Sequence, residues 1–122
     1  MTHPPAFLNI VEEAKKTVNE VTIDQVLERQ KSGEHMHFVD VREDDEFRAG
    51  HAAGAVHIGK GVIERDIERK IPERDAPIVL YCGGGFRSAL AAESLKKMGY
   101  THVDSVAGGY QAWCERGLPT ER

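Results

Sequence analysis

A cysteine followed directly by three glycines is the feature of this 122-residue chain that is best suited to chemistry. In "VLYCGGGFRSALAAESLKKMGY", residues 79–100, Cys82 follows an apolar run, and Arg87 stands at the start of a segment with helical character. Glycine has no Cβ and takes positive φ readily, so residues 83–85 can curl the main chain until several N–H groups point at one atom. Such a loop would stabilise a thiolate on Cys82, a second sulfur attached to it, or an anionic substrate.

The segments on either side of the cysteine predict where the thiol lies. Ile78–Tyr81 is apolar without alternation, which is typical of a central strand covered on both faces. Ser88–Met98 has apolar residues at helical spacing, and Ser88 is expected to be its N-cap. Ligands of an open α/β sheet bind outside the carboxyl ends of its strands, which is where this strand delivers Cys82. The helix dipole and the fixed charge of Arg87 both favour a thiolate there.

Strand-like and helix-like segments alternate along the whole chain. This pattern predicts an α/β fold, with three α/β/α layers and a mostly parallel sheet of about five strands. We expect an N-terminal arm and short helix over residues 1–20, a single domain over 21–118, and a C-terminal tail over 119–122.

The N-terminal segment contains two adjacent prolines, which discourage a helix interior. We therefore expect a loose arm over residues 1–8 and a short helix that begins with Asn9 as its cap. Thr22 and Gln25 have the spacing of a capping box, which predicts the start of a second helix.

Composition limits the classes of function. With 40% hydrophobic and 30% charged residues, the chain can build an ordinary folded core. The net charge of −4 gives no support to nucleic-acid binding, and no run of residues is long and apolar enough for a membrane span. The first residues do not read as a signal peptide, and the two cysteines are too few for a disulfide-stapled domain. We expect a cytoplasmic protein with reduced thiols and no membrane partner.

The length of the glycine loop separates two kinds of cysteine chemistry. Cys82 and Arg87 define a C-x4-R spacing. Cysteine-dependent phosphatases use C-x5-R, one residue longer, to hold a tetrahedral phosphate. The shorter loop favours a single sulfur atom over a phosphoryl group, although geometry alone leaves both open.

Three blocks of the chain resemble, in order, the signature blocks of the single-domain rhodaneses. They are "DVREDDEFRAGHAAGAVHI", "VLYCGGGFRSALAAESLKKMGY" and "VAGGYQAW". The resemblance extends over about residues 20 to 118. One departure is Ala52 and Ala53, where the family often has an apolar residue and a proline. Another is the absence of bulky or basic side chains at Gly83 and Gly84, which bears on the choice of donor.

The resemblance implies a sulfurtransferase that needs no cofactor and no metal. Cys82 would attack the sulfane sulfur of thiosulfate or a persulfide donor, and a cysteine persulfide would remain. Cyanide in an assay, or a cellular thiol such as thioredoxin or glutathione, would then take the sulfur. The residues that would hold substrate and persulfide sulfur follow Cys82 directly: Gly83, Gly84, Gly85, Phe86, Arg87 and Ser88.

A second group of residues is expected to support this site. Asp40 and Arg42 match a family D-x-R, and Asp40 is expected to accept backbone N–H groups near a strand end. Arg87 would either contact a donor oxyanion or pair with an acid such as Glu46. Cys114 could resolve a persulfide as a disulfide, but a packing role is favoured.

Two alternatives to a thiosulfate sulfurtransferase stay open. The first is a rhodanese-like binding module that carries or senses persulfide with little turnover. The second is a cysteine-dependent phosphatase or arsenate reductase on the same scaffold.

Overall fold

The computed structural model describes residues 2–122. Its helices are α1 (Pro5–Lys15), α2 (Ile23–Lys31), α3 (Asp44–Ala49), α4 (Ile63–Lys70), α5 (Phe86–Lys97) and α6 (Gly109–Glu115). Its strands are β1 (Asn19–Val21), β2 (His37–Asp40), β3 (His51–Ala52), β4 (Val56–His57), β5 (Ile78–Tyr81), β6 (Val103–Val106) and β7 (Thr120–Glu121).

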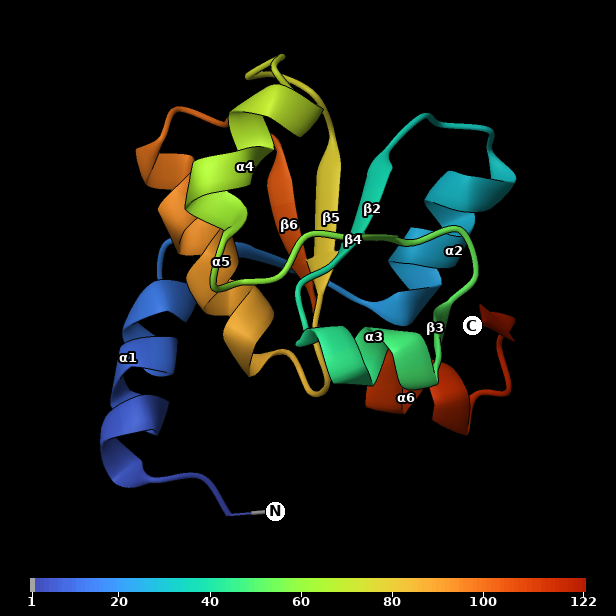
Figure 1. The fold of residues 1–122 in the computed structure, drawn as a ribbon, viewed down its shortest axis with the longest axis horizontal. Helices are drawn as coiled ribbons and strands as arrows, with labels where there is room; N and C mark the ends of the chain where they lie inside the picture. Colours follow the sequence, from blue (N-terminus) through green and yellow to red (C-terminus); the bar gives the residue numbers. More distant parts are fainter. Residues whose placement is uncertain (1) are drawn as a thin grey trace.

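Five of the strands form one parallel sheet in the order β1-β6-β5-β2-β4. Helices α1, α4 and α5 lie on one side of it, and α2 and α6 lie on the other (Figure 1). This arrangement confirms the predicted three-layer α/β fold. β3 and β7 form a separate antiparallel pair, so the stretch expected to be a tail is tied back by main-chain pairing. None of the helices in residues 2–122 has the length and apolar character to cross a bilayer.

The central strand β5 supplies side chains to both of the hydrophobic layers. Ile78 and Leu80 pack with α4 and α5 in one hydrophobic cluster. Cys82, two residues further along the chain, belongs to the same cluster. Val79 and Tyr81 point the other way and pack beneath α2 and α6. Successive side chains of a strand face opposite sides of a sheet, so a strand that is covered on both faces is apolar at every position.

The N-terminal helix begins earlier than the sequence pattern predicts. α1 starts at Pro5, with Pro4 as its N-cap, and Asn9 lies inside the helix. The expectation of a loose arm over residues 1–8 is therefore wrong from Pro5 onward. Proline lacks an N–H and has a fixed φ near −65°, which suits the first helical position, where no N–H is bonded within the helix. Val11 and Ala14 of α1 are buried, and the helix packs on α5.

The second helix begins as its sequence predicts. Thr22 Oγ1 accepts the N–H of Gln25 at 3.1 Å, and Gln25 Oε1 accepts the N–H of Thr22 at 2.8 Å. These reciprocal bonds form a capping box, which fixes Thr22 as the residue between the end of β1 and the start of α2.

Candidate functional site

Cys82 lies at the carboxyl end of the central strand, directly before the glycine loop. Its side chain is only 1% exposed. The sulfur is nevertheless in contact with the loop, because Gly85 donates its backbone N–H to Sγ across 3.1 Å. Within residues 2–122, Gly85 is the residue whose main-chain N–H forms a hydrogen bond with Sγ of Cys82.

The turn into α5 depends on Gly85 and not on Ser88. Gly85 is the N-cap, with φ +101° and ψ 2°, so the prediction of a serine cap is wrong. A Cβ at Gly85 would also lie 3.3 Å from the carbonyl oxygen of Val106. Glycine therefore allows both the left-handed backbone and the close approach to β6.

Ser88 lies in the first turn of α5, in contact with the thiol. Its hydroxyl is fully buried, 3.5 Å from Cys82 Sγ. Its Oγ is also 2.7 Å from the Oγ of Ser105, a buried residue of β6. Sequence reasoning did not find Ser105, because one serine within a short strand carries no signal of contact with a site elsewhere in the chain.

The carbonyl groups of the loop are bound by the last helix. Tyr110 donates its N–H to the carbonyl of Cys82 at 2.8 Å, and Gln111 donates to the carbonyl of Gly83 at 3.0 Å. Gly109 makes this approach possible, because a Cβ there would lie 2.4 Å from the Cys82 oxygen. The two hydrogen bonds fix the orientation of the first two peptide groups of the loop. The N–H groups that follow are oriented with them, since a peptide unit is planar.

Arg87 is held by an acid from a distant part of the chain. Its guanidinium donates to both carboxylate oxygens of Glu46 on α3, at 2.7 and 3.1 Å. Of the two roles considered for Arg87, the structure therefore has the ion pair with Glu46. The hydrogen bonds from Arg87 hold the pKa of Glu46 below its ordinary value, against the opposing effect of partial burial. This pair fixes α3 against the first turn of α5.

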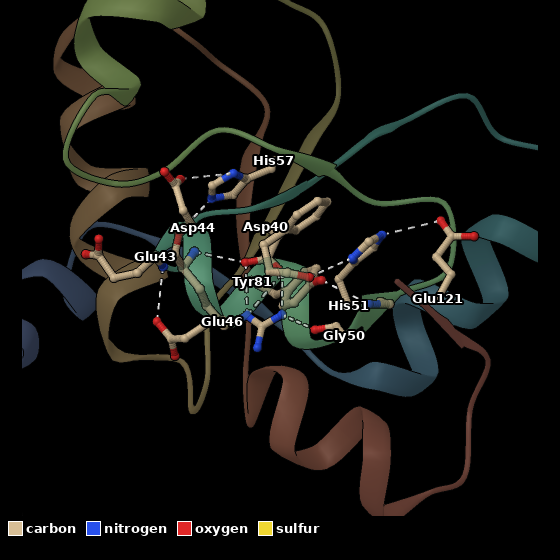
Figure 2. A network of polar contacts seen from close by, with 12 residues as sticks. Asp40, Glu43, Asp44, Glu46, Gly50, His51, His57, Tyr81 and Glu121 are labelled. Carbon is tan, nitrogen blue, oxygen red and sulfur yellow. Dashed lines mark hydrogen bonds and ion pairs between the residues drawn. The ribbon is translucent and has the colours of Figure 1, made fainter.

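Asp40, the last residue of β2, forms a buried ion pair with Arg42. Asp40, Gly50 and Tyr81 belong to the same network of polar contacts (Figure 2). Asp40 accepts the backbone N–H of Arg42 at 2.9 Å and the guanidinium Nη2 at 2.7 Å. Nη2 also donates to the carbonyl of Gly50 at 2.7 Å, and the guanidinium stacks 4.2 Å from the centre of the Tyr110 ring. Burial, the largest single effect, lowers the pKa of Arg42, but hydrogen bonding to Asp40 and the attraction of the nearby negative charges together outweigh it, so the pKa is raised overall. The pair thus connects β2, the end of α3 and α6, all of which border the loop.

The side chain of Phe86 makes the loop part of a contact with α1. Its ring lies 4.6 Å from the ring of His3 and 6.3 Å from that of Phe7, both measured between centroids. Lys15 Nζ lies 5.2 Å from the centre of the same ring. Nothing in the sequence pattern indicated this contact, because it depends on where α1 begins.

The remaining candidates lie apart from the thiol. Cys114 is a free, exposed cysteine on α6. His35 and His37 form an H-x-H pair in the sequence, and their rings make a T-shaped contact with centroids 5.0 Å apart. Within residues 2–122, no three His, Cys, Asp or Glu side chains are grouped as metal ligands would be. A groove of about 880 Å³ is lined by Pro77, Asn19 and Val103, among others, at or next to the amino ends of strands. It is therefore at the edge of the sheet opposite the loop.

Comparison with known proteins places the chain in a family. Residues 22–116 match the family model described as "Rhodanese-like domain". The match spans most of the chain, so the protein belongs to the rhodanese-like family. Its relatives include sulfurtransferases.

The chain is similar in sequence to named sulfurtransferases and similar in fold to a solved structure. The chain is 33% identical to thiosulfate sulfurtransferase GlpE of Vibrio cholerae, over 84% of this chain and 92% of that protein. It is also 33% identical to thiosulfate sulfurtransferase PspE of Escherichia coli, over 59% of this chain and 69% of that protein. Two further relatives are longer, and the chain covers 66% and 54% of them. A solved structure from Rhodopseudomonas palustris, titled a protein of unknown function and possible tyrosine phosphatase, superposes with a TM-score of 0.86 at 31% identity. That superposition covers 99% of this chain and 98% of the other.

Proposed function

We propose that this protein is a sulfurtransferase that takes a sulfane sulfur from thiosulfate onto Cys82 and passes it to a thiophilic acceptor. The observation that carries the proposal is the 3.1 Å contact from the Gly85 N–H to Cys82 Sγ, at the start of α5 and the carboxyl end of β5. A main-chain donor at a helix N-terminus stabilises negative charge on sulfur and does not compete with it as a nucleophile. The kinship with thiosulfate sulfurtransferases supports thiosulfate as the donor to test first.

The proposed reaction has two displacement steps. In the first, the thiolate of Cys82 attacks the outer sulfur of thiosulfate, the S–S bond of thiosulfate breaks, and sulfite leaves with the electron pair. The enzyme is then a persulfide whose outer sulfur carries the negative charge. In the second step, cyanide attacks that outer sulfur, thiocyanate leaves, and the thiolate of Cys82 is restored. The cycle is covalent catalysis without net oxidation of the protein.

The glycine loop is suited to the persulfide intermediate. Gly83, Gly84 and Gly85 present no side chains to the outer sulfur, and we propose that main-chain N–H groups of residues 83–88 receive it. A Cβ at Gly83 would lie 3.1 Å from Nη2 of Arg87, so a larger residue there would have to displace that guanidinium by a few tenths of an ångström. In the cell, the acceptor in this proposal is a thiol such as glutathione or thioredoxin.

A phosphatase activity is the less favoured alternative, although one structural neighbour carries that suggestion in its title. The loop is one residue shorter than the C-x5-R loop of cysteine-dependent phosphatases. The Nη1–Nη2 edge of the Arg87 guanidinium, which could hold phosphate oxygens, is engaged, since both nitrogens donate to Glu46. Hydrolysis of an aryl phosphate by the protein as folded would revive this alternative.

The test uses the two cysteines as a matched pair. Steady-state transfer from thiosulfate to cyanide is measured for the wild-type protein, Cys82→Ala and Cys114→Ala. We expect loss of activity in Cys82→Ala with circular dichroism unchanged, and near wild-type activity in Cys114→Ala. Turnover by Cys82→Ala would refute the proposal.

A carrier of persulfide with little turnover is separated by a second measurement. Mass spectrometry after incubation with thiosulfate would detect one added sulfur on Cys82 in an enzyme and in a carrier alike. An enzyme then transfers it repeatedly to cyanide or glutathione, whereas a carrier releases at most one equivalent per chain.

A further inference from the structure

Two buried hydroxyl groups lie in a row behind Cys82. Ser88 and Ser105 are both 0% exposed, although serine is seldom fully buried. The row runs from Sγ to Ser88 Oγ at 3.5 Å, and from there to Ser105 Oγ at 2.7 Å. Within residues 2–122, neither hydroxyl has any other hydrogen-bond partner. Burying two hydroxyl groups costs free energy, which the contacts along this row must offset.

The number of hydrogens in the row decides which form of Cys82 fits it. The row has two gaps to bridge, one between sulfur and Ser88 and one between the serines. The serines contribute two hydrogens, so each gap holds one when sulfur has none: Ser105 donates to Ser88, and Ser88 donates to Sγ. With a protonated thiol, Sγ donates to Ser88 Oγ, Ser88 donates to Ser105 Oγ, and the Ser105 hydrogen is left buried without an acceptor among residues 2–122. An unsatisfied buried donor is costly.

This count is the same for a thiolate and for a persulfide, since Sγ carries no hydrogen in either form. From this geometry we infer that the Ser88–Ser105 hydroxyl pair is a one-directional donor chain that selects the hydrogen-free forms of Cys82. Ser88 is the direct donor to the reacting sulfur. Ser105 is a positioning residue that acts through Ser88. It donates a hydrogen bond to Ser88 Oγ, so the hydrogen of Ser88 is directed toward Sγ of Cys82. The inference deepens the proposed function and rests on Cys82 being the nucleophile.

The charged groups around the loop come from other directions. Arg87 and its partner Glu46 face the loop from α5 and α3. Lys15 at the end of α1, and His3 before its start, both contact the ring of Phe86. β6 contributes the hydroxyl of Ser105. The hydroxyl chain therefore reaches Sγ of Cys82 from the side of β6.

The test measures ionisation of Cys82 directly and does not require turnover. Thiolate absorbance is titrated against pH in a Cys114→Ala background, where Cys82 is the only thiol, and the spectrum of the protein lacking both cysteines is subtracted. We expect Ser88→Ala to raise the pH of half-ionisation by about one unit, through the loss of a hydrogen bond to a charged group. Ser105→Ala should raise it by roughly half a unit, through loss of polarisation and orientation of Ser88. Ser94→Ala, a half-buried serine of the same helix, is the matched control and should cause no shift.

The double variant distinguishes a chain from two independent effects. Because Ser105 acts only through Ser88, Ser88→Ala/Ser105→Ala should titrate as Ser88→Ala does. It should also be more stable to urea than Ser88→Ala, because the single change leaves the Ser105 hydroxyl buried without a partner. Ser105→Thr keeps the hydroxyl and should restore the wild-type titration even if its extra methyl group lowers stability.

The outcomes separate this inference from the proposed function. Additive shifts in the double variant, or no shift in Ser105→Ala, would overturn the donor chain even if sulfur transfer is found. The expected shifts in a protein without sulfur transfer would support the donor chain and count against the enzyme.

Discussion

Adding one methyl group at Gly109 should displace the loop that holds Cys82 while the overall fold is kept. Its Cβ in Gly109→Ala would lie 2.4 Å from the carbonyl oxygen of Cys82 and 2.9 Å from the carbonyl carbon of Gly83. Both are main-chain atoms, so no rotation of a side chain relieves the contact. The perturbation therefore acts directly on the loop that holds the thiol.

The magnitude follows from two contributions. Ordinary contact for a Cβ begins at 3.4 Å, so the Cys82 carbonyl must move by about 1 Å from its present 2.4 Å. Such overpacking costs about 1–3 kcal/mol of stability. Gly109 also has φ +52°, where an L-residue costs about 1–2 kcal/mol. We expect a loss of roughly 2–5 kcal/mol in the free energy of unfolding, and a displaced nucleophile that lowers transfer activity about a hundredfold.

Gly117→Ala is the matched control. Gly117 has φ +66°, and nothing lies within 4 Å of the Cβ that it would gain. It should lose only the conformational contribution of about 1–2 kcal/mol and keep its activity. Urea unfolding gives the stability of both variants, and thiosulfate:cyanide transfer per folded molecule gives the activity. Equal stability and equal activity in the two variants would show that the approach of α6 does not position the loop.

Three further predictions concern the groups around the loop. Glu46→Gln should lower transfer activity and cost less than about 1 kcal/mol of stability, because the Arg87 pair is partly exposed to solvent. Hydrogen bonds from Arg87 lower the pKa of Glu46, so the stability difference between wild type and Glu46→Gln should be greatest above pH 4.5 and should vanish as pH falls through the folded-state pKa. Urea unfolding at a series of pH values measures this difference, and a difference that grows in acid would contradict the prediction. Phe7→Ala should reduce amide-exchange protection around Phe86, whereas Ile10→Ala, at 54% exposure on the same helix, should leave it unchanged.

The sequence predicts the central part of the fold because the signals there are local. Ile78–Tyr81 is an uninterrupted apolar run, and a strand of that kind has to be covered on both faces. The glycines that follow it mark the turn, so the place of Cys82 at the sheet edge can be deduced without the structure. The expected helix after the loop is also present, but it begins at Phe86 because a left-handed glycine, not a serine side chain, ends the turn.

The contacts that complete the site could not be deduced in this way. Glu46 was one of several acids available to Arg87, and 41 residues separate the two. Ser105 appears in the sequence only as a polar residue in a short strand. Such contacts depend on how strands are ordered in the sheet, and the pairing of β5 with β6 and β2 is set by the whole core.

The dependence of the loop on α6 has a consequence for synthesis of the chain. Cys82 and its glycines leave the ribosome well before Gly109, Tyr110 and Gln111. Until those residues emerge, the carbonyl groups of Cys82 and Gly83 lack the donors that orient them. A nascent chain from which residue 82 has emerged and residues 109–111 have not therefore carries its thiol on a loop whose carbonyl groups lack these two donors.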